Sequence, residues 1–145
     1  MNEKLAPIIS TIQILTTIDI VTARQRGREL AQHHGFSKGE QTRFATAISE
    51  LTRNIITYAD KGRCEFYSYE KENYQIVSAK MIDHGPGIDN PQLAITDGYS
   101  SGSGLGLGLP GAKRLVHELL IESVPGLTEI KISIKQKKVM INGHN

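Results

Sequence analysis

Residues 102–111 read Gly-Ser-Gly-Leu-Gly-Leu-Gly-Leu-Pro-Gly, a run in which glycine alternates with larger residues. Eight of the 14 glycines of the chain lie between Gly85 and Gly111. Glycine loses more conformational freedom on folding than any other residue, so this spacing indicates a backbone that must approach a ligand closely. Successive backbone N–H groups that lead into a helix form a cradle for an anion such as phosphate. The run therefore predicts a phosphate-binding loop, followed by a helix that begins near Pro110.

The commoner nucleotide-binding motifs do not account for this run. The chain contains no Gly-x-x-x-x-Gly-Lys-Ser/Thr, so it has no P-loop. It also lacks the His-Arg-Asp and Asp-Phe-Gly motifs of eukaryotic protein kinases. Gly106, Gly108 and Gly111 match the dinucleotide-binding fingerprint by letter. However, no predicted strand immediately precedes them, and they come too late in the chain to open a dinucleotide-binding fold.

Upstream of the run, the segment Asp83-His84-Gly85-Pro86-Gly87 stands at the end of a predicted strand. A carboxylate fixed at this point can accept a hydrogen bond from an exocyclic amine such as that of adenine. The two glycines allow the backbone to approach the flat face of a base. Taken alone, a tight turn closed by the Asp83 side chain is the better explanation, because Asp, Pro and Gly are the usual turn residues.

Further upstream, the spacing of Ser37 and Glu40 matches a capping box and predicts the start of the clearest helix in the chain. Glu50 and Asn54 are four residues apart on this helix and therefore share a face. The carboxylate could accept a proton and the amide oxygen could bind a hard cation such as Mg²⁺. In isolation, an ordinary solvated helix flank is the simpler interpretation. The apolar stripe expected to face the core consists of Phe44, Ile48, Leu51 and Ile55.

Alternation of apolar and polar residues, together with turn residues, predicts the remaining elements. In chain order we expect a strand at 11–18, a helix at 19–31 with Asp19 as its N-cap, strands at 63–69 and 74–83, a helix from about Pro110 to Leu119, and a hairpin around Pro125-Gly126 that leads into a strand at 130–134.

This order of elements predicts an α+β fold. Two consecutive hairpins make the sheet substantially antiparallel, and helices cover one of its faces most economically. We therefore expect a two-layer α/β sandwich, in which three main helices lie on one face of a mixed sheet. We assign residues 1–138 to a single domain and expect residues 139–145 to form a flexible C-terminal tail.

Composition narrows the class of protein. The 145 residues include 17 Lys and Arg against 15 Asp and Glu, so the charge is nearly balanced and gives no reason to expect a nucleic-acid or membrane partner. A single cysteine excludes an internal disulfide framework and a cysteine-based zinc site. No apolar run approaches the roughly 20 residues that a membrane span needs. We expect a soluble, cytoplasmic protein.

The three motifs, in this order, resemble the N, G1 and G2 boxes of the GHKL ATPase superfamily, which includes gyrase, Hsp90, histidine kinases and MutL. That superfamily holds Mg-ATP in an α/β sandwich, between a long helix and a glycine-rich lid. Within it, the chain is similar to the small bacterial serine/threonine kinases of partner-switching systems, above all to the switch kinases of the stressosome. The stretches that carry this likeness are residues 18–25, 46–55, 83–88 and 108–115.

The resemblance implies ATP and Mg²⁺ as cofactors and a role for each motif. Glu50 would be the general base for the substrate hydroxyl, and Asn54 would hold Mg²⁺. Asp83 would bind the adenine amine with support from Thr128. The other residues implied in ATP binding are Arg53, Gly85, Gly87 and Ile88, together with the lid residues Gly102, Gly104, Leu105, Gly106, Leu107 and Gly108.

The resemblance also implies partners. A kinase of this kind would phosphorylate STAS-domain scaffold or antagonist proteins of a stressosome. Once released from them, it would bind and activate a downstream effector such as a PP2C-type phosphatase. The alternative is a nucleotide-dependent anti-sigma factor of the same fold, which mainly sequesters a sigma factor. A degenerate relative that binds no nucleotide is a third interpretation, which the presence of Glu50, Asn54 and Asp83 disfavours.

Overall fold

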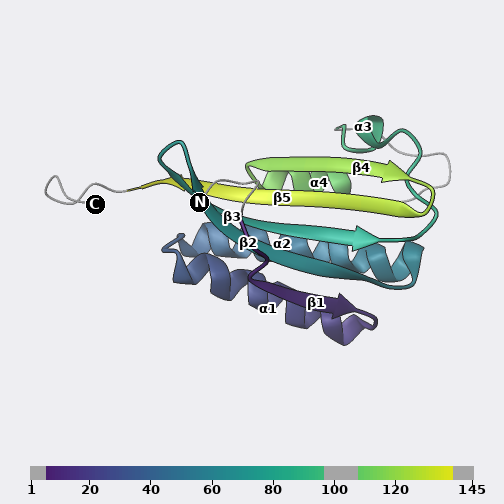
Figure 1. The fold of residues 1–145 in the computed structure, drawn as a ribbon, viewed down its shortest axis with the longest axis horizontal. Coiled ribbons are helices and arrows are strands. Elements are labelled where there is room, and N and C mark those ends of the chain that lie inside the picture. The colour runs from purple at the N-terminus through teal and green to yellow at the C-terminus, as the bar shows by residue number, and fades with distance from the viewer. Residues whose placement is uncertain (1–5, 97–107, 139–145) are drawn as a thin grey trace, which may run out of the picture.

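Five strands and their covering helices make up the protein in a computed structural model that describes residues 6–96 and 108–138. The predicted order of elements is confirmed, with one short helix and one π-helix added to it (Figure 1). The elements are β1 (Ser10–Ile14), α1 (Thr17–His33), α2 (Lys38–Asn54), the π-helix η2 (Ile55–Ala59), β2 (Gly62–Lys71), β3 (Tyr74–Asp83), α3 (Pro91–Ala94), α4 (Leu109–Leu115), β4 (Glu118–Val124) and β5 (Leu127–Lys137).

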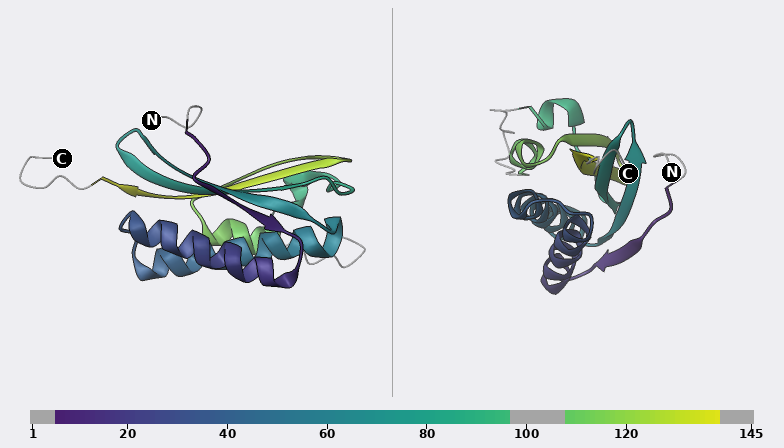
Figure 2. Two further views of the ribbon diagram at one scale, coloured as in Figure 1. Left: turned by 60° about the horizontal axis from the view of Figure 1, so that its bottom comes forward. Right: turned by 90° about the vertical axis from the view of Figure 1, so that its left-hand side faces the viewer.

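The sheet has the strand order β1-β2-β3-β5-β4, and α1, α2 and α4 lie together on one of its faces (Figure 2). The predicted α+β two-layer sandwich is therefore confirmed. The prediction of a mixed sheet is wrong in the part that the structure describes, because all four strand pairings there are antiparallel. The reason lies in β5. The α4 crossover makes β3 and β4 run in the same direction, but β5 inserts between them and pairs antiparallel with both.

The core lies between the sheet and the helices. The stripe predicted on α2 is confirmed, because Phe44, Ile48, Leu51 and Ile55 are all buried. Burial of each such side chain contributes roughly 1.5–3 kcal/mol relative to exposure. α1 packs against this layer at Gly27, where a Cβ atom would collide with Ile48 and lie 3.4 Å from Phe66. The sheet side chains of the core cluster are Ile14, Cys64, Phe66, Val77, Ala79, Met81, Leu119, Ile121, Ile130, Ile132 and Ile134.

The first helix begins earlier than the sequence predicts. The strand expected at residues 11–18 ends at Ile14, and the N-cap of α1 is Thr16 rather than Asp19. Asp19 instead occupies the third helical position, where Oδ2 accepts hydrogen bonds from the backbone N–H groups of Leu15 (2.8 Å) and Thr16 (2.9 Å). These two bonds, that from Leu15 first, hold the pKa of the Asp19 carboxyl below its usual range. A carboxylate can satisfy orphan amides from the cap or from one turn inside, and sequence alone does not separate these positions.

The start of α2 is as predicted. Ser37 is the N-cap, and its hydroxyl accepts a hydrogen bond of 3.2 Å from the backbone N–H of Glu40. We expect Ser37→Ala to lower the free energy of unfolding by about 1 kcal/mol, because an orphan amide at the helix start loses its acceptor. Urea denaturation followed by circular dichroism measures this change. Ser37→Asp is the control, because it retains an acceptor and should keep the stability of the parent. Equal stability of all three proteins would contradict the role of the cap.

The helix near Pro110 is shorter than predicted. α4 ends at Leu115 instead of about Leu119, because Leu119 and Ile121 alternate with exposed residues and pair with β5 as part of β4. The one-turn helix α3 was not predicted from the sequence. None of the helices in the two described ranges is long and apolar enough to cross a membrane.

Candidate functional site

The C-terminal end of α2 continues into a π-helix, an element that frequently occurs at functional sites. Asn54 is the last residue of α2, and η2 follows without a break. The chain then reverses at Asp60, which has φ 72° and ψ −50°, while the N–H of Lys61 donates to the carbonyl of Ala59 at 2.8 Å. This is the geometry of a γ-turn of the rare, strained kind. It fixes Ala59 beside the loop that follows β3.

That loop begins with the predicted turn at the end of β3. Oδ1 of Asp83 accepts a hydrogen bond of 2.9 Å from the backbone N–H of Gly85. The carbonyl of Gly85 in turn accepts from the N–H of Gly126, at 2.9 Å, in the β4–β5 hairpin. Gly87 has φ +88°, and a Cβ atom there would lie 2.9 Å from the backbone of Val124. The turn interpretation and the binding interpretation of this motif are therefore compatible, because the turn uses one carboxylate oxygen only.

Thr128 lies directly beside Asp83, because the two residues are paired in the register of β3 with β5. Its side chain is 3% exposed, and its hydroxyl lies 2.6 Å from that of Ser123. The Ser123 hydroxyl also accepts a hydrogen bond of 2.8 Å from the backbone N–H of Ile88. A chain of short polar contacts therefore connects the strand residue next to Asp83 with the loop that follows it.

These elements enclose one pocket between α2, η2 and the sheet. Its residues come from the end of the sheet where β3 terminates, an end that can be followed in Figure 1. Five of the residues predicted in the site line it: Asn54, Asp83, Gly87, Ile88 and Thr128. They come from four parts of the chain. The other lining residues are mainly apolar: Leu51, Ile55, Tyr58, Ala59, Met81, Pro86 and Ile130. A slot with apolar walls and a few convergent polar groups is typical of a small-molecule site.

Glu50 and Arg53 do not line this pocket. Glu50 precedes the pocket residue Asn54 by one turn of α2, and Arg53 directly precedes it in the sequence. Their side chains are 44% and 53% exposed, and Nη1 of Arg53 lies 3.4 Å from Oε1 of Glu50. The start of α4 comes close to the same carboxylate. Gly108 has φ +68°, and a Cβ atom there would lie 2.8 Å from Oε2 of Glu50. The Glu50 side chain therefore points from α2 toward Gly108, at the end of the glycine-rich run.

The predicted lid residues Gly102, Gly104, Leu105, Gly106 and Leu107 lie outside the described residues, and of that set only Gly108 can be placed. Gly85 does not line the pocket, but it holds the turn at Asp83 in place.

Ser123, which contacts Thr128 beside the pocket, was missed in the sequence, as were two residues that line the pocket. Ser123 was overlooked although a signal for it exists: Leu119 and Ile121 alternate toward the core, and Ser123 continues that alternation as a polar residue. Tyr58 and Ala59, both in η2, were not predicted as pocket residues. The local residue pattern at Ile55–Ala59 does not predict a π-helix.

The contact of Gly85 with Ala59 makes a prediction about stability. A Cβ atom at position 85 would lie 2.6 Å from Cβ and 2.9 Å from Cα of Ala59. Both distances are shorter than a van der Waals contact, so the backbone at residue 85 or at Ala59 would have to move. We expect Gly85→Ala to lower the free energy of unfolding by about 1–3 kcal/mol, the usual cost of overpacking. Urea denaturation measures it. Gly111→Ala is the matched control, because the nearest atom would be 3.9 Å away; equal loss in both variants would argue against this contact.

Comparison with known proteins places this chain in a family. Residues 39–138 match the model of the family described as histidine kinase-, DNA gyrase B-, and HSP90-like ATPase. The chain is 44% identical over 117 residues to the serine/threonine-protein kinase RsbT of Bacillus subtilis. That match covers 81% of this chain and 88% of the relative. The GHKL resemblance predicted from three short motifs is thereby confirmed.

Solved structures agree with this in fold. The RsbU and RsbW domains of a Mycobacterium tuberculosis protein match with a TM-score of 0.57 at 18% identity, over 92% of this chain but only 35% of that one. The SiaB–SiaC complex from Pseudomonas aeruginosa matches with a TM-score of 0.51 at 15% identity, over 89% and 91%. Because the family model spans more than half of the chain and RsbT matches most of it, the chain belongs to the histidine kinase-, DNA gyrase B- and HSP90-like ATPase family, and within it to the serine/threonine protein kinases related to RsbT.

Proposed function

We propose that the protein transfers the γ-phosphate of ATP to a serine or threonine of STAS-domain scaffold or antagonist proteins of a stressosome. The observation that carries this proposal is the convergence of Asn54, Asp83 and Thr128 on one pocket, with Glu50 one turn away on the same helix. RsbT, the relative matched over most of its length, is a serine/threonine-protein kinase by name. The pocket supplies what such a kinase needs for its nucleotide.

The adenine end of the nucleotide fits the Asp83 side of the pocket. Oδ1 of Asp83 is used by the turn to Gly85, which leaves Oδ2 as the acceptor for the exocyclic amine of the base. We assign Thr128, the neighbour of Asp83 in the register, to support of that carboxylate, and its hydroxyl lies 2.6 Å from that of Ser123. Gly87 presents backbone without a side chain to the base, and Ile88 adds an apolar contact. Adenine recognition by a fixed carboxylate is therefore the role that we assign to this end.

The phosphate end fits the α2 side. The amide oxygen of Asn54 is a hard ligand of the kind that Mg²⁺ prefers. The residues described contain no group of three His, Cys, Asp or Glu side chains that could hold a metal ion. A Mg²⁺ at Asn54 would therefore take most of its ligands from the nucleotide phosphates and from water, which is its usual mode in kinases. An ion held there would neutralise phosphate charge, and Arg53 and the backbone at Gly108 would complete the surroundings of the triphosphate.

Glu50 is the group that we assign to the substrate hydroxyl. It precedes Asn54 by one turn, so their Cβ atoms are separated by roughly 5–6 Å on one helix face. This spacing holds a proton acceptor beside the phosphates without placing it on them. The carboxylate would take the proton of the serine or threonine hydroxyl as the hydroxyl oxygen bonds to the γ-phosphorus. The bond from that phosphorus to the bridging oxygen would break, and ADP would leave with its electron pair. Positioning of this kind, with charge stabilisation, supplies most of the catalysis of phosphoryl transfer.

The partners follow from the resemblance to partner-switching kinases. We propose that the protein acts in the cytoplasm and leaves the phosphorylated STAS-domain protein. It then binds and activates a downstream effector such as a PP2C-type phosphatase. Neither step requires a nucleic acid or a membrane. The affinity for each partner would then decide which complex forms under stress.

The test is transfer of label from γ-labelled ATP, in the presence of Mg²⁺, to purified STAS-domain proteins of the source organism. Label on a serine or threonine of the STAS-domain protein is the expected result. Tight ATP binding with no transfer to any of them would overturn the kinase assignment. In that case a sigma factor that co-purifies with the chain would favour the anti-sigma alternative.

A further inference from the structure

A second pocket lies on the face of the sheet that points away from α1, α2 and α4. Val77, Ala79 and Met81 of β3 belong to the core, so the alternate residues Ile76 and Ser78 point to the opposite face. Figure 2 shows this face at the side of the sheet without the three main helices. The pocket there is lined by Tyr69, Lys71, Glu72, Tyr74, Ile76, His117, Glu118, Ser133 and Lys135.

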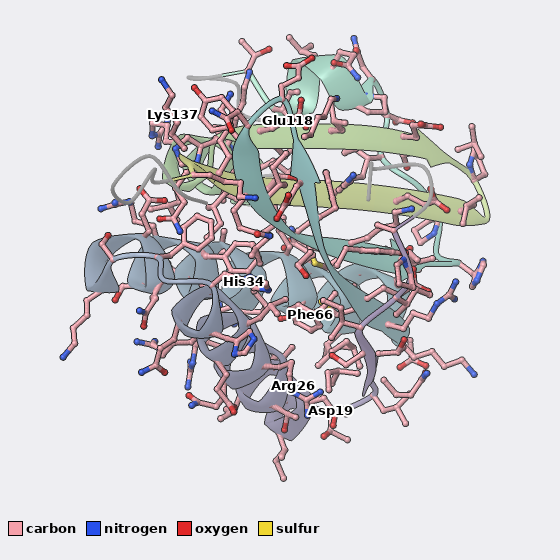
Figure 3. All side chains as sticks on the ribbon, turned by 60° about the vertical axis from the view of Figure 1, so that its left-hand side comes forward. Asp19, Arg26, His34, Phe66, Glu118 and Lys137 are labelled. Carbon is pink, nitrogen blue, oxygen red and sulfur yellow. The ribbon has the colours of Figure 1, made fainter. Side chains whose placement is uncertain are left out.

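The two pockets are separate. Ile76 is seven residues from Asp83 along β3, or about 23 Å at the rise of a strand. The pocket lies toward the β2–β3 hairpin and the start of β4, where Figure 3 labels Glu118, and the Asp83 pocket lies at the other end of β3. A ligand of one pocket therefore leaves the other free.

The floor of this second pocket is a buried chain of hydroxyl groups. Tyr69 and Ser133 are each 5% exposed, and Ser78 beneath them is fully buried. The Ser78 hydroxyl donates to the Tyr69 hydroxyl at 3.5 Å and lies 2.8 Å from that of Ser133. Nζ of Lys131 also donates to the Tyr69 hydroxyl, at 3.2 Å. The Tyr69 oxygen therefore accepts two hydrogen bonds at once.

In this chain of hydroxyl groups, one proton has no acceptor in the part of the protein that the structure describes. Ser78 has one hydroxyl proton and gives it to Tyr69, so Ser133 must be the donor in the Ser78–Ser133 pair. The proton of Tyr69 itself then needs an acceptor, and none of the hydrogen bonds among the described residues supplies one. The neighbouring Tyr67 differs in this respect, because its hydroxyl donates to Oε1 of Glu65 at 2.8 Å. Two donors polarise the Tyr69 hydroxyl and make its proton a strong donor toward an oxyanion.

The rim of the pocket adds further donors. Lys135 stands over the ring of Tyr74, with Nζ 4.7 Å from the ring centroid. Its backbone N–H donates to Nδ1 of His117 at 3.1 Å, so the proton of the neutral His117 ring lies on Nε2. The two carboxylates of the rim, Glu72 and Glu118, are exposed to solvent and are absent from the buried floor.

From these contacts we propose that this pocket binds a small ligand through an oxyanion, a carboxylate or a phosphate group. The oxyanion accepts the proton of the Tyr69 hydroxyl on the floor and lies near Lys135 and His117 at the rim. Ile76 and the Tyr74 ring contact the apolar part of the ligand. The proposal does not depend on the kinase assignment, because it concerns the other face and the other end of the sheet.

Inorganic phosphate and acetate, titrated separately into the ¹⁵N-labelled full chain and followed by amide chemical shifts, test this site. Potassium chloride at matched ionic strength serves as the reference. We expect saturable shifts within residues 69–78 and 133–135 with at least one of the two anions, and the anion that binds more tightly tells carboxylate from phosphate. Absence of any saturable shift there with both anions would overturn the proposal.

Tyr69→Phe removes the hydroxyl that donates to the anion, together with the oxygen that accepts from Ser78 and Lys131. We expect it to weaken anion binding about tenfold or more, as loss of a hydrogen bond to a charged group does. Tyr67→Phe is the matched control and should bind the anion as the parent does. Unchanged binding by Tyr69→Phe would contradict the proposal. Lys135→Met, at an exposed position, provides a second variant that should also weaken binding, and unchanged ATP affinity of both variants shows that the fold is intact.

Discussion

The Glu50→Gln variant is expected to transfer phosphate about 10²–10⁴ times more slowly than the parent chain, the range in which a positioned general base contributes. Glutamine has the size and helix propensity of glutamate but accepts no proton at neutral pH. The change therefore removes only the function that we assign to this carboxylate. The measurement is the initial rate of label transfer from γ-labelled ATP to the STAS-domain substrate, at saturating ATP and Mg²⁺.

Binding and stability should remain nearly as they are. The Glu50 side chain is 44% exposed and pairs with Arg53, whose Nη1 lies 3.4 Å from Oε1 of Glu50. Exposed ion pairs of this kind contribute roughly 0–1 kcal/mol to stability. Calorimetry should therefore give the same affinity for ATP in the variant and the parent. This combination, a lost rate with retained binding, separates a catalytic role from a role in holding the nucleotide.

Glu29→Gln is the matched control, because it makes the same chemical change at an exposed position of α1. It should leave both the rate and the affinity unaltered. Equal rates for Glu50→Gln and Glu29→Gln would remove Glu50 from the mechanism. A loss of ATP affinity in Glu50→Gln alone would reassign Glu50 to nucleotide or metal binding.

Much of the fold could be predicted because its elements carry local signals. The α2 stripe repeats at helical spacing, and both hairpins have alternating strands around turn residues, such as Glu72 and Asn73 with positive φ. Boundaries were less secure where two elements compete for the same residues. Leu119 suits a helix by spacing and a strand by alternation, and only pairing with Ile132 of β5 decides between them.

The site required more than local signals. Asp83 and Thr128 become neighbours through the register of β3 with β5, and the antiparallel character of the sheet follows from where β5 inserts. Both are long-range facts that no local pattern encodes. The ordered set of three motifs and the family resemblance nevertheless named residues that share one pocket: Asn54, Asp83, Gly87, Ile88 and Thr128. The roles of these residues, the lid and the domain limits at residues 138 and 139 stay predictions.

Asp83→Asn is expected to weaken ATP binding about 10–100-fold, the cost of replacing a hydrogen bond to a charged group with a mismatched one. The turn at this position decides which atom of the asparagine amide would face the adenine amine. Because the N–H of Gly85 donates to Oδ1, an asparagine keeps its amide oxygen there and presents its NH₂ group where Oδ2 stood. Two donors, the asparagine NH₂ and the adenine amine, would then face each other. Calorimetric titration with a non-hydrolysable ATP analogue measures the loss.

The same geometry predicts a change of base preference, which a loss of stability would not produce. Guanine carries a carbonyl where adenine carries its amine, so the asparagine NH₂ group gains an acceptor in GTP. The ratio of ATP affinity to GTP affinity should therefore fall in Asp83→Asn, and urea denaturation should show that the turn survives. Asp89→Asn, at an exposed position in the same loop, is the control and should keep the parent ratio. An unchanged ratio in Asp83→Asn would mean that Asp83 only closes the turn and that adenine is recognised elsewhere in the pocket.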